Sequence, residues 1–291
     1  MLITVIRVRL LHSLRYLVAV SLLALYLVTA GKCLGQEQPP QTEEQRQARE
    51  ALDKGVQNFK NGQHDAAIED FRHAKQLDPQ LLNARLYLAT AYASQYIPGA
   101  PSKENRRLGE NAVAEFRDVL TIQPENLSAI DGIGSILFQM AGQLYDPNLF
   151  AEARNCFLKH AQIQPNDPEP YYWVGVIDWT LSFRANIELR ERFNQYARGK
   201  ELDNADPLPQ DLRVKYAQEY GPTIIEGIDS LQKAIALRPD YDDAMAYLNL
   251  LYRRKADVVD SETEREELIK MADDLIDKVK EIKTRRVTPS S

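Results

Sequence analysis

The chain has 291 residues, of which 44% are apolar and 27% charged, and it carries a net charge of −6. This composition is typical of a globular protein with a sizeable core. An acidic chain without a basic stripe is a poor candidate for binding nucleic acid, whose phosphates repel it, and it lacks the basic patch that anionic lipid attracts.

The first 35 residues differ from the rest of the chain. They contain four basic residues and no acid, and an uncharged stretch runs from Tyr16 to Gly31. A basic start, a short apolar run and small residues after it are typical of a secretory signal peptide, which we expect to be cleaved after Ala30 or Gly35. The alternative is an uncleaved membrane anchor, although a stable span usually needs about 18 or more apolar residues. We therefore expect an exported protein of the periplasm or cell envelope.

A short pattern recurs five times along the chain. Alanine is followed four residues later by phenylalanine and eight residues after that by proline, with changes in the last two copies. Apolar or small residues also stand three and six places after the phenylalanine in most copies, which is the spacing of one helix face. The proline then ends the helix. The copies are Ala67/Phe71/Pro79, Ala112/Phe116/Pro124, Ala153/Phe157/Pro165, Gly227/Leu231/Pro239 and Ala272/Ile276.

A second pattern follows each proline at the same offset: Leu88-Ala89-x-x-Tyr92, Ile133-Gly134-x-x-Leu137, Val174-Gly175-x-x-Asp178 and Leu248-Asn249-x-x-Tyr252. Together the two patterns resemble the tetratricopeptide repeat (TPR), whose consensus is W-x2-L-G-x2-Y…A-x3-F…P. The resemblance implies an all-α, right-handed superhelix of about five helix pairs, each with a helix A and a helix B. It also implies that the A helices line a concave side that commonly receives an extended or helical peptide.

The expected organisation follows from these patterns. Residues 1–35 form the signal peptide or anchor, 36–45 a flexible linker, 46–285 the repeat domain and 286–291 a disordered tail. The expected repeats are 48–81, 82–126, 127–167, 168–241 and 242–285. In four of them the A and B helices are separated by insertions, which would lie on one edge of the solenoid and could form a functional rim or be tolerated loop extensions.

The largest insertion, residues 181–226, is expected to be helical. Apolar residues stand four apart from Trp179 to Ile187, so the A helix should run on toward Gly199 before "NADPLPQD" breaks it. A short helix should follow, and the chain should restart at Gly221-Pro222 into the B helix.

The resemblance also identifies side chains that would point into the concave side: Leu86, Thr90, Asp131, Phe138, Tyr172, Val176, Trp179 and Arg253. The candidate partner-binding residues are Leu86, Thr90, Phe138, Tyr172, Val176 and Trp179, because apolar and aromatic side chains exposed in a groove mark binding sites. The alternative is that the long insertion folds back and covers Tyr172 and Trp179 as core.

Two polar residues occupy places that the repeat usually keeps apolar. His160 stands three residues after Phe157, and Asp178 stands three after Gly175. They belong to adjacent helices, so a buried His160–Asp178 contact is possible. We expect Asp178 to be paired or to line a wet groove, because an unpartnered buried acid is costly.

No sequence motif of a nucleotide loop, serine hydrolase, zinc protease or paired-cysteine site is present. We therefore expect no enzyme, no catalytic residues, no cofactor and no metal. The predicted function is a scaffold or adaptor of the cell envelope that binds a protein or peptide partner, with no nucleic acid, and with membrane only if the leader is retained. The alternatives are an enzyme or small-ligand receptor with a pocket near His160, Asp178 and the 181–226 insertion, and a membrane-tethered assembly factor.

Overall fold

The computed structural model describes residues 42–287, with the exception of residues 198, 200 and 205. The expected signal peptide (1–35), most of the expected linker and residues 288–291 lie outside the described residues. No helix within the described ranges combines the length and the apolar character that a membrane crossing requires.

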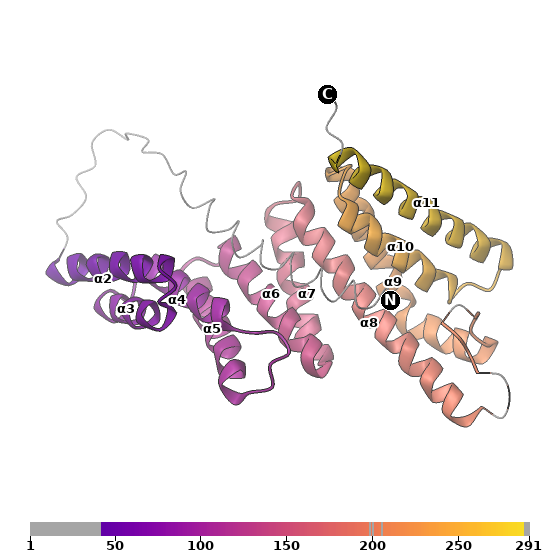
Figure 1. Cartoon of the computed structure of the whole chain (residues 1–291), viewed down its shortest axis with the longest axis horizontal. Coiled ribbons are helices and arrows are strands. Elements are labelled where there is room, and N and C mark those ends of the chain that lie inside the picture. The colour runs from indigo at the N-terminus through magenta and orange to yellow at the C-terminus, as the bar shows by residue number, and fades with distance from the viewer. Residues whose placement is uncertain (1–41, 198, 200, 205, 288–291) are drawn as a thin grey trace. The chain divides into compact units, whose positions relative to one another are not determined.

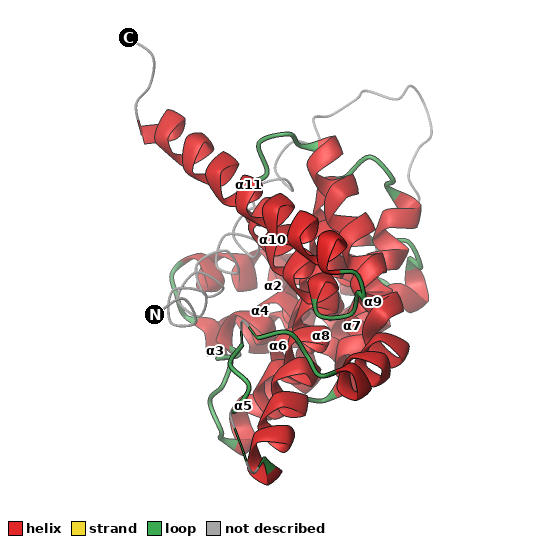
Figure 2. Cartoon of the chain, turned by 90° about the vertical axis from the view of Figure 1, so that its right-hand side faces the viewer, coloured by secondary structure: helices red, strands yellow, loops and turns green. Residues whose placement is uncertain are grey.

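All regular structure in the described residues is helical, which confirms the all-α class (Figure 1; Figure 2). Ten described helices form five successive pairs, in which the first helix takes the A position and the second the B position. The pairs are α2 (Glu43–Lys60) and α3 (His64–Leu77), α4 (Leu82–Gln95) and α5 (Lys103–Ile122), α6 (Leu127–Leu144) and α7 (Pro147–Ile163), α8 (Pro168–Tyr196) and α9 (Gln210–Leu237), and α10 (Asp242–Ala256) and α11 (Glu262–Val287).

The chain divides into two compact units, the first ending at Ile136 and the second beginning at Leu137, so the boundary lies within α6. In the first unit, α3 packs against α2 and α4, and α4 packs against α5. In the second unit, α8 lies against α7 and α9, α10 lies against α9 and α11, and the two A helices α8 and α10 also touch. Packing between sequence neighbours is the arrangement of a stacked helical repeat.

The recurring positions of the sequence form the seams between these helices. Ala67, Ala112, Ala153 and Ala272 are fully buried. The residues at the phenylalanine position of the first four copies are at most 5% exposed, whereas Ile276, on the last described helix, is 38% exposed. The pattern therefore predicts the buried core residues of four repeats. In the fifth repeat, the residue at the phenylalanine position is no longer covered by apolar neighbours.

The ends of the repeat region differ slightly from the expected boundaries. Helix α2 begins at Glu43, inside the expected linker, because Thr42 caps it: the Thr42 hydroxyl accepts the Gln45 backbone N–H at 3.2 Å. Helix α11 continues to Val287, past the expected start of the tail at residue 286. In the first turn, Gly62 adopts a φ of 75°, which glycine tolerates without strain.

The 181–226 segment consists mainly of the second half of α8 and the first half of α9. Helix α8 continues to Tyr196, as expected, and a connection follows before α9 begins. The expected restart at Gly221-Pro222 is wrong, because α9 runs without interruption with Pro222 inside it. A proline in this place removes one backbone hydrogen bond of the helix.

Packing on either side of Pro222 outweighs that loss. Tyr216, before the proline, is 2% exposed, and its hydroxyl donates to the Ser182 carbonyl at 2.7 Å. Ile224, after the proline, is fully buried. Both halves of α9 are thus fixed in the core, and the helix continues through Pro222 without a break.

Gly175 allows α8 and α9 to approach closely. A Cβ atom at this position would lie within 3 Å of three side-chain atoms of Leu231. We expect Gly175→Ala to lower the free energy of unfolding by about 1–3 kcal/mol, because the added methyl group overpacks a buried seam. Urea unfolding followed by far-UV circular dichroism measures the change.

Gly142→Ala is the matched control, since a Cβ atom on this helical glycine would meet no atom within 4 Å. We expect the control to be unchanged or more stable by up to about 1 kcal/mol, because alanine favours helix over glycine. Equal losses at the two positions would contradict the close-packing explanation.

Candidate functional site

The six predicted partner-binding residues lie on A helices of both units, and in each unit the side that carries them is here called the A-helix face. In the first unit this face contains Leu86 and Thr90 of α4. Leu86 is 8% exposed, and Thr90 is half-buried, with its hydroxyl donating to the Leu86 carbonyl at 2.8 Å. The Thr90 hydroxyl is therefore engaged with its own helix, and this part of the face offers mainly a small apolar surface.

In the second unit the A-helix face contains an aromatic row. Neighbouring ring centroids in the row lie 5.0–5.8 Å apart. At this spacing aromatic pairs attract each other beyond the effect of buried area. The members of the row, from α6, α8 and α10, are Phe138, Trp173, Tyr172, Tyr247, Trp179 and Phe183.

The middle of the row is buried and its ends are partly open. Tyr172 and Trp173 are 7% and 2% exposed, whereas Phe138, Trp179 and Phe183 are half-buried. The row therefore fixes partly exposed rings on a rigid base.

The sequence predicts that Tyr172 and Val176 lie on an open surface, but both side chains are buried. Val176 is 1% exposed, and the Tyr172 ring is covered by Tyr241 and Tyr247, with centroids at 5.0 and 5.8 Å. The cover thus comes from α10 and the residue that precedes it. Phe183, at the start of the insertion, stacks on Trp179 with centroids 5.0 Å apart, but it does so from the next turn of the same helix, and Trp179 stays half-buried.

Asp178 is fully buried and paired, as expected, but its partner is Arg154 of α7. The Arg154 guanidinium donates from Nε to Oδ1 at 2.7 Å and from Nη2 to Oδ2 at 3.2 Å. Nη2 also donates to the Glu226 carboxylate of α9 at 2.5 Å. Burial raises the pKa of Asp178 to about 6, and the Arg154 guanidinium opposes that rise. Arg154 therefore ties three helices together.

The expected His160–Asp178 contact is wrong. His160 is 5% exposed, and its Nε2 lies 3.4 Å from Oδ2 of Asp167, the residue that caps α8. The His160 imidazole beside it holds the pKa of Asp167 below its usual value. His160 lies near the end of α7 and therefore meets the start of α8, whereas Asp178 lies further along α8, where the long Arg154 side chain reaches it.

A stripe of polar residues, which the sequence analysis missed, fastens the second half of α8. Asp178, Ser182, Asn186, Arg190 and Asn194 stand at every fourth position, and the first four are at most 2% exposed. Residues four apart on a helix are neighbours on its surface, so this spacing was a readable signal. The stripe turns gradually around α8, from Arg154 and Gly227 at Asp178 to the connection and the end of α10 at Arg190.

Arg190 is the centre of this network. Its Nη1 donates to the carbonyls of Asp203 and Asp206 at 2.7 and 2.9 Å, and its Nη2 donates to the Asp257 carboxylate at 3.1 Å. Arg254 Nη1 lies 3.0 Å from the other Asp257 oxygen. Burial lowers the pKa of Arg190 and raises that of Asp257, and the pairing between them opposes both shifts. These contacts join the connection between α8 and α9 to the end of α10.

A sequence model of the tetratricopeptide repeat matches residues 53–81, which comprise the end of α2, all of α3 and the turn after it. This is the one copy without an insertion. No curated protein sequence matches the chain.

Solved structures extend the comparison to most of the chain. The crystal structure of MamA protein has a TM-score of 0.54 and 14% identity, and the match covers 84% of this chain and 97% of that one. A MamA structure from Desulfovibrio magneticus RS-1, beginning at residue 41, has a TM-score of 0.54 and 16% identity over 86% and 100% of the two chains. YrrB, described as a TPR protein with an unusual peptide-binding site, gives 0.51 and 13% over 83% and 95%. The fold is that of the tetratricopeptide repeat. At these identities the likeness shows the TPR fold alone.

Double-mutant cycles distinguish the two possible partners of Asp178. We expect Arg154→Met to lower the free energy of unfolding by about 3 kcal/mol, because it leaves a buried carboxylate without a counter-ion. Adding Asp178→Asn should recover more than 1 kcal/mol of that loss. In the control cycle, His160→Ala and Asp178→Asn should add to within about 0.5 kcal/mol. Coupling in the His160 cycle and additivity in the Arg154 cycle would overturn the assignment; urea unfolding measures both.

Proposed function

We propose that the chain is an interaction scaffold or adaptor of the bacterial cell envelope and that it binds a protein or peptide segment on the A-helix face of the second unit. A TPR fold supports a role in protein–protein interaction in general. The observation that supports this particular site is the aromatic row, whose buried members hold Trp179 and Phe183 in place. Rigid, partly exposed aromatic side chains are favoured anchors of interfaces, because little entropy is lost when a partner covers them.

The burial data narrow the set of contact residues. In the second unit, Phe138 and Trp179 keep exposed surface and stay in the proposal, with Phe183 added, whereas Thr90 belongs to the first unit and is left out of it. Tyr172 is buried against Trp173 and Tyr247 of the same row, and Val176 and, in the first unit, Leu86 are buried and offer little surface to a partner. The preferred partner segment is therefore one with apolar or aromatic side chains that cover the Trp179–Phe183 pair.

The alternative of an enzyme or small-ligand receptor near His160 and Asp178 has less support. Arg154 binds both oxygens of Asp178, and His160 lies against Asp167. Both groups act as links between helices, which is a structural role.

The A-helix face can be tested with one substitution and a matched control on the same helix. We expect Trp179→Ala to weaken capture of the partner from envelope extract by about 30-fold, since truncating a central aromatic anchor costs about 2 kcal/mol. Tyr196→Ala is the control, because Tyr196 is 75% exposed at the end of α8 and lies outside the aromatic row. Quantitative pull-down over a range of bait concentrations measures the effect. Equal retention of the partner by both variants would contradict the proposal.

The envelope assignment has its own test. We expect the full chain, expressed in a bacterium, to yield a mature protein that begins at Gly31 or Gln36 and appears in the periplasmic fraction. Amino-terminal sequencing and fractionation measure this. An intact leader in the membrane pellet would instead support the membrane-tethered assembly factor.

A further inference from the structure

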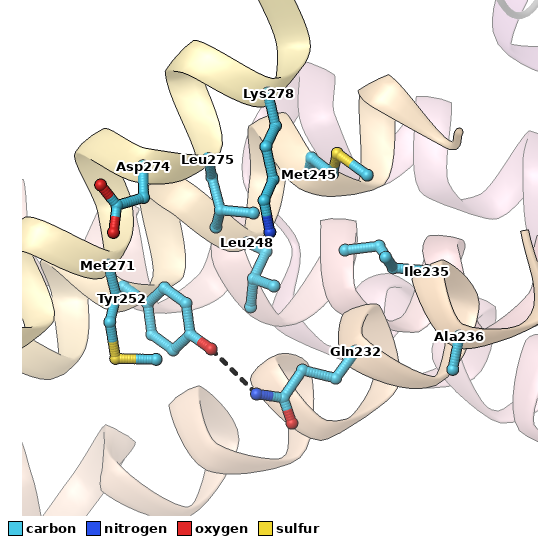
Figure 3. A pocket seen from close by; sticks show the side chains of 10 residues that line it. All are labelled: Gln232, Ile235, Ala236, Met245, Leu248, Tyr252, Met271, Asp274, Leu275 and Lys278. Atoms are coloured by element: carbon cyan, nitrogen blue, oxygen red, sulfur yellow. Dashed lines mark hydrogen bonds between the residues drawn. The ribbon is translucent and has the colours of Figure 1, made fainter. Parts of the chain in front are cut away.

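The second unit has another apolar surface, between its last two B helices, here called the B-helix groove (Figure 3). Met245, Leu248 and Tyr252 of α10 form its floor. Helix α9 and helix α11 form its walls, and the hollow has a volume of about 410 Å³. Tyr247, on another side of α10, faces α8. The groove and the A-helix face therefore use different sides of the same helix.

The same place in the first unit can be compared residue by residue, because repeats 1–2 and repeats 4–5 are in register. Corresponding residues differ by 160 in number. The correspondence includes a hydrogen bond: Arg72 donates to the Tyr92 hydroxyl at 2.9 Å, and Gln232 donates to the Tyr252 hydroxyl at 2.9 Å. The other pairs are Lys75/Ile235, Arg85/Met245, Glu115/Leu275 and Asp118/Lys278.

In the first unit, ion pairs cross this place. Lys75 of α3 lies 2.6 Å from Glu115 and 3.3 Å from Asp118, both on α5. Arg85 of α4 lies 2.9 Å from Asp118. The two B helices and the A helix beneath them are therefore tied together by charge.

The junction of the third and fourth repeats is also crossed by an ion-paired group. Arg154 of α7 binds Asp178 of α8 and Glu226 of α9. By the repeat register, Asp178 corresponds to Tyr252 and Glu226 to Met271. Two junctions are thus bridged by charged side chains, whereas the B-helix groove has apolar residues at nearly all the matching places.

Because no charged side chains among the described residues bridge the B-helix groove, its apolar surface stays open to water. Met271, on the wall of the groove, is 44% exposed, and Ile235 on the opposite wall is half-buried. Exposed apolar surface around a hollow marks a docking site, and methionine adapts to the shape of an incoming side chain.

The charges at the groove indicate what kind of segment fits. Asp274 and Lys278 lie on α11 within the lining, one helical turn apart. Among the described residues, 42–287 without 198, 200 and 205, neither of them forms an ion pair. A segment that carries both a basic and an acidic residue beside its apolar side chain would complement them.

We propose that the B-helix groove docks a short segment of a partner protein, with an apolar anchor between Ile235 and Met271, a basic residue against Asp274 and an acidic residue against Lys278. This second docking surface does not depend on binding at the A-helix face. A scaffold with two such surfaces can hold two segments at once.

The test selects a phage-displayed library of random 12-residue peptides on the full chain. The groove-closed variant is Ile235→Lys/Lys278→Asp, which recreates the Lys75–Asp118 pair of the first unit. We expect enriched peptides to contain apolar anchors flanked by both charges. Their affinity, measured by fluorescence anisotropy of synthetic peptides, should fall at least tenfold on the groove-closed variant.

Two further variants make the result specific. Met271→Glu, which copies Glu226 at an exposed position, should weaken the same peptides at least tenfold and remain folded. Trp179→Ala should leave their affinity unchanged, which separates this proposal from the A-helix face.

Three results would overturn the proposal: no enriched peptide, equal affinity for the wild-type chain and both groove variants, or a self-association of the wild-type chain in sedimentation velocity that the groove-closed variant abolishes. The last result would identify a second copy of the chain as the occupant.

Discussion

The structure depends on a close approach between the two helices of a repeat, at a point where a small residue of helix A faces a large residue of helix B. Gly55 and Gly175 hold the same place in their repeats, and a Cβ atom on either would lie within 3 Å of Phe71 or Leu231, respectively. Where two backbones come this close, the seam has room only for apolar packing. Polar side chains are therefore confined to the edges of the seam, where they link one helix pair to the next.

Gly227 shows how a local exception is accommodated. It stands where the four other copies have alanine, and an added Cβ atom would meet Asp178 and Leu251. The missing methyl group makes room for the buried Asp178, which in turn requires Arg154. One small residue, one acid and one arginine thus form a single structural unit, although each breaks the repeat pattern when it is taken alone.

The sequence predicts the helix pairs well because their signals are local and repeated. Alanine, phenylalanine and proline positions recur within about a dozen residues of each other, so each copy supports the others. The effect of Pro222 is predicted wrongly because it is decided by packing and not by a local, repeated signal. Its effect on α9 is decided by Tyr216 and Ile224, whose burial depends on packing that no local pattern reveals.

The candidate site was predicted less completely, for geometric reasons. Placing Tyr172 on the A-helix face was a matter of register, but its exposure depends on Tyr241 and Tyr247, about 70 residues later in the chain. The pairing of Asp178 required the antiparallel course of α7 and α8, in which residues near the turn meet each other and residues far from it meet each other. That rule matches His160 with Asp167 and Arg154 with Asp178.

The Arg190 network has a consequence for the order in which the chain folds. Most contacts in a stacked repeat join neighbouring elements, so folding can spread from one helix pair to the next. Arg190 and Asp257 are 67 residues apart, and their contact cannot form before the end of α10 is in place. The long hairpin of α8 and α9 is therefore secured late in folding. By the same reasoning, loss of the fifth repeat would release the hairpin first, and local unfolding there would expose Arg190 while the earlier repeats stay folded.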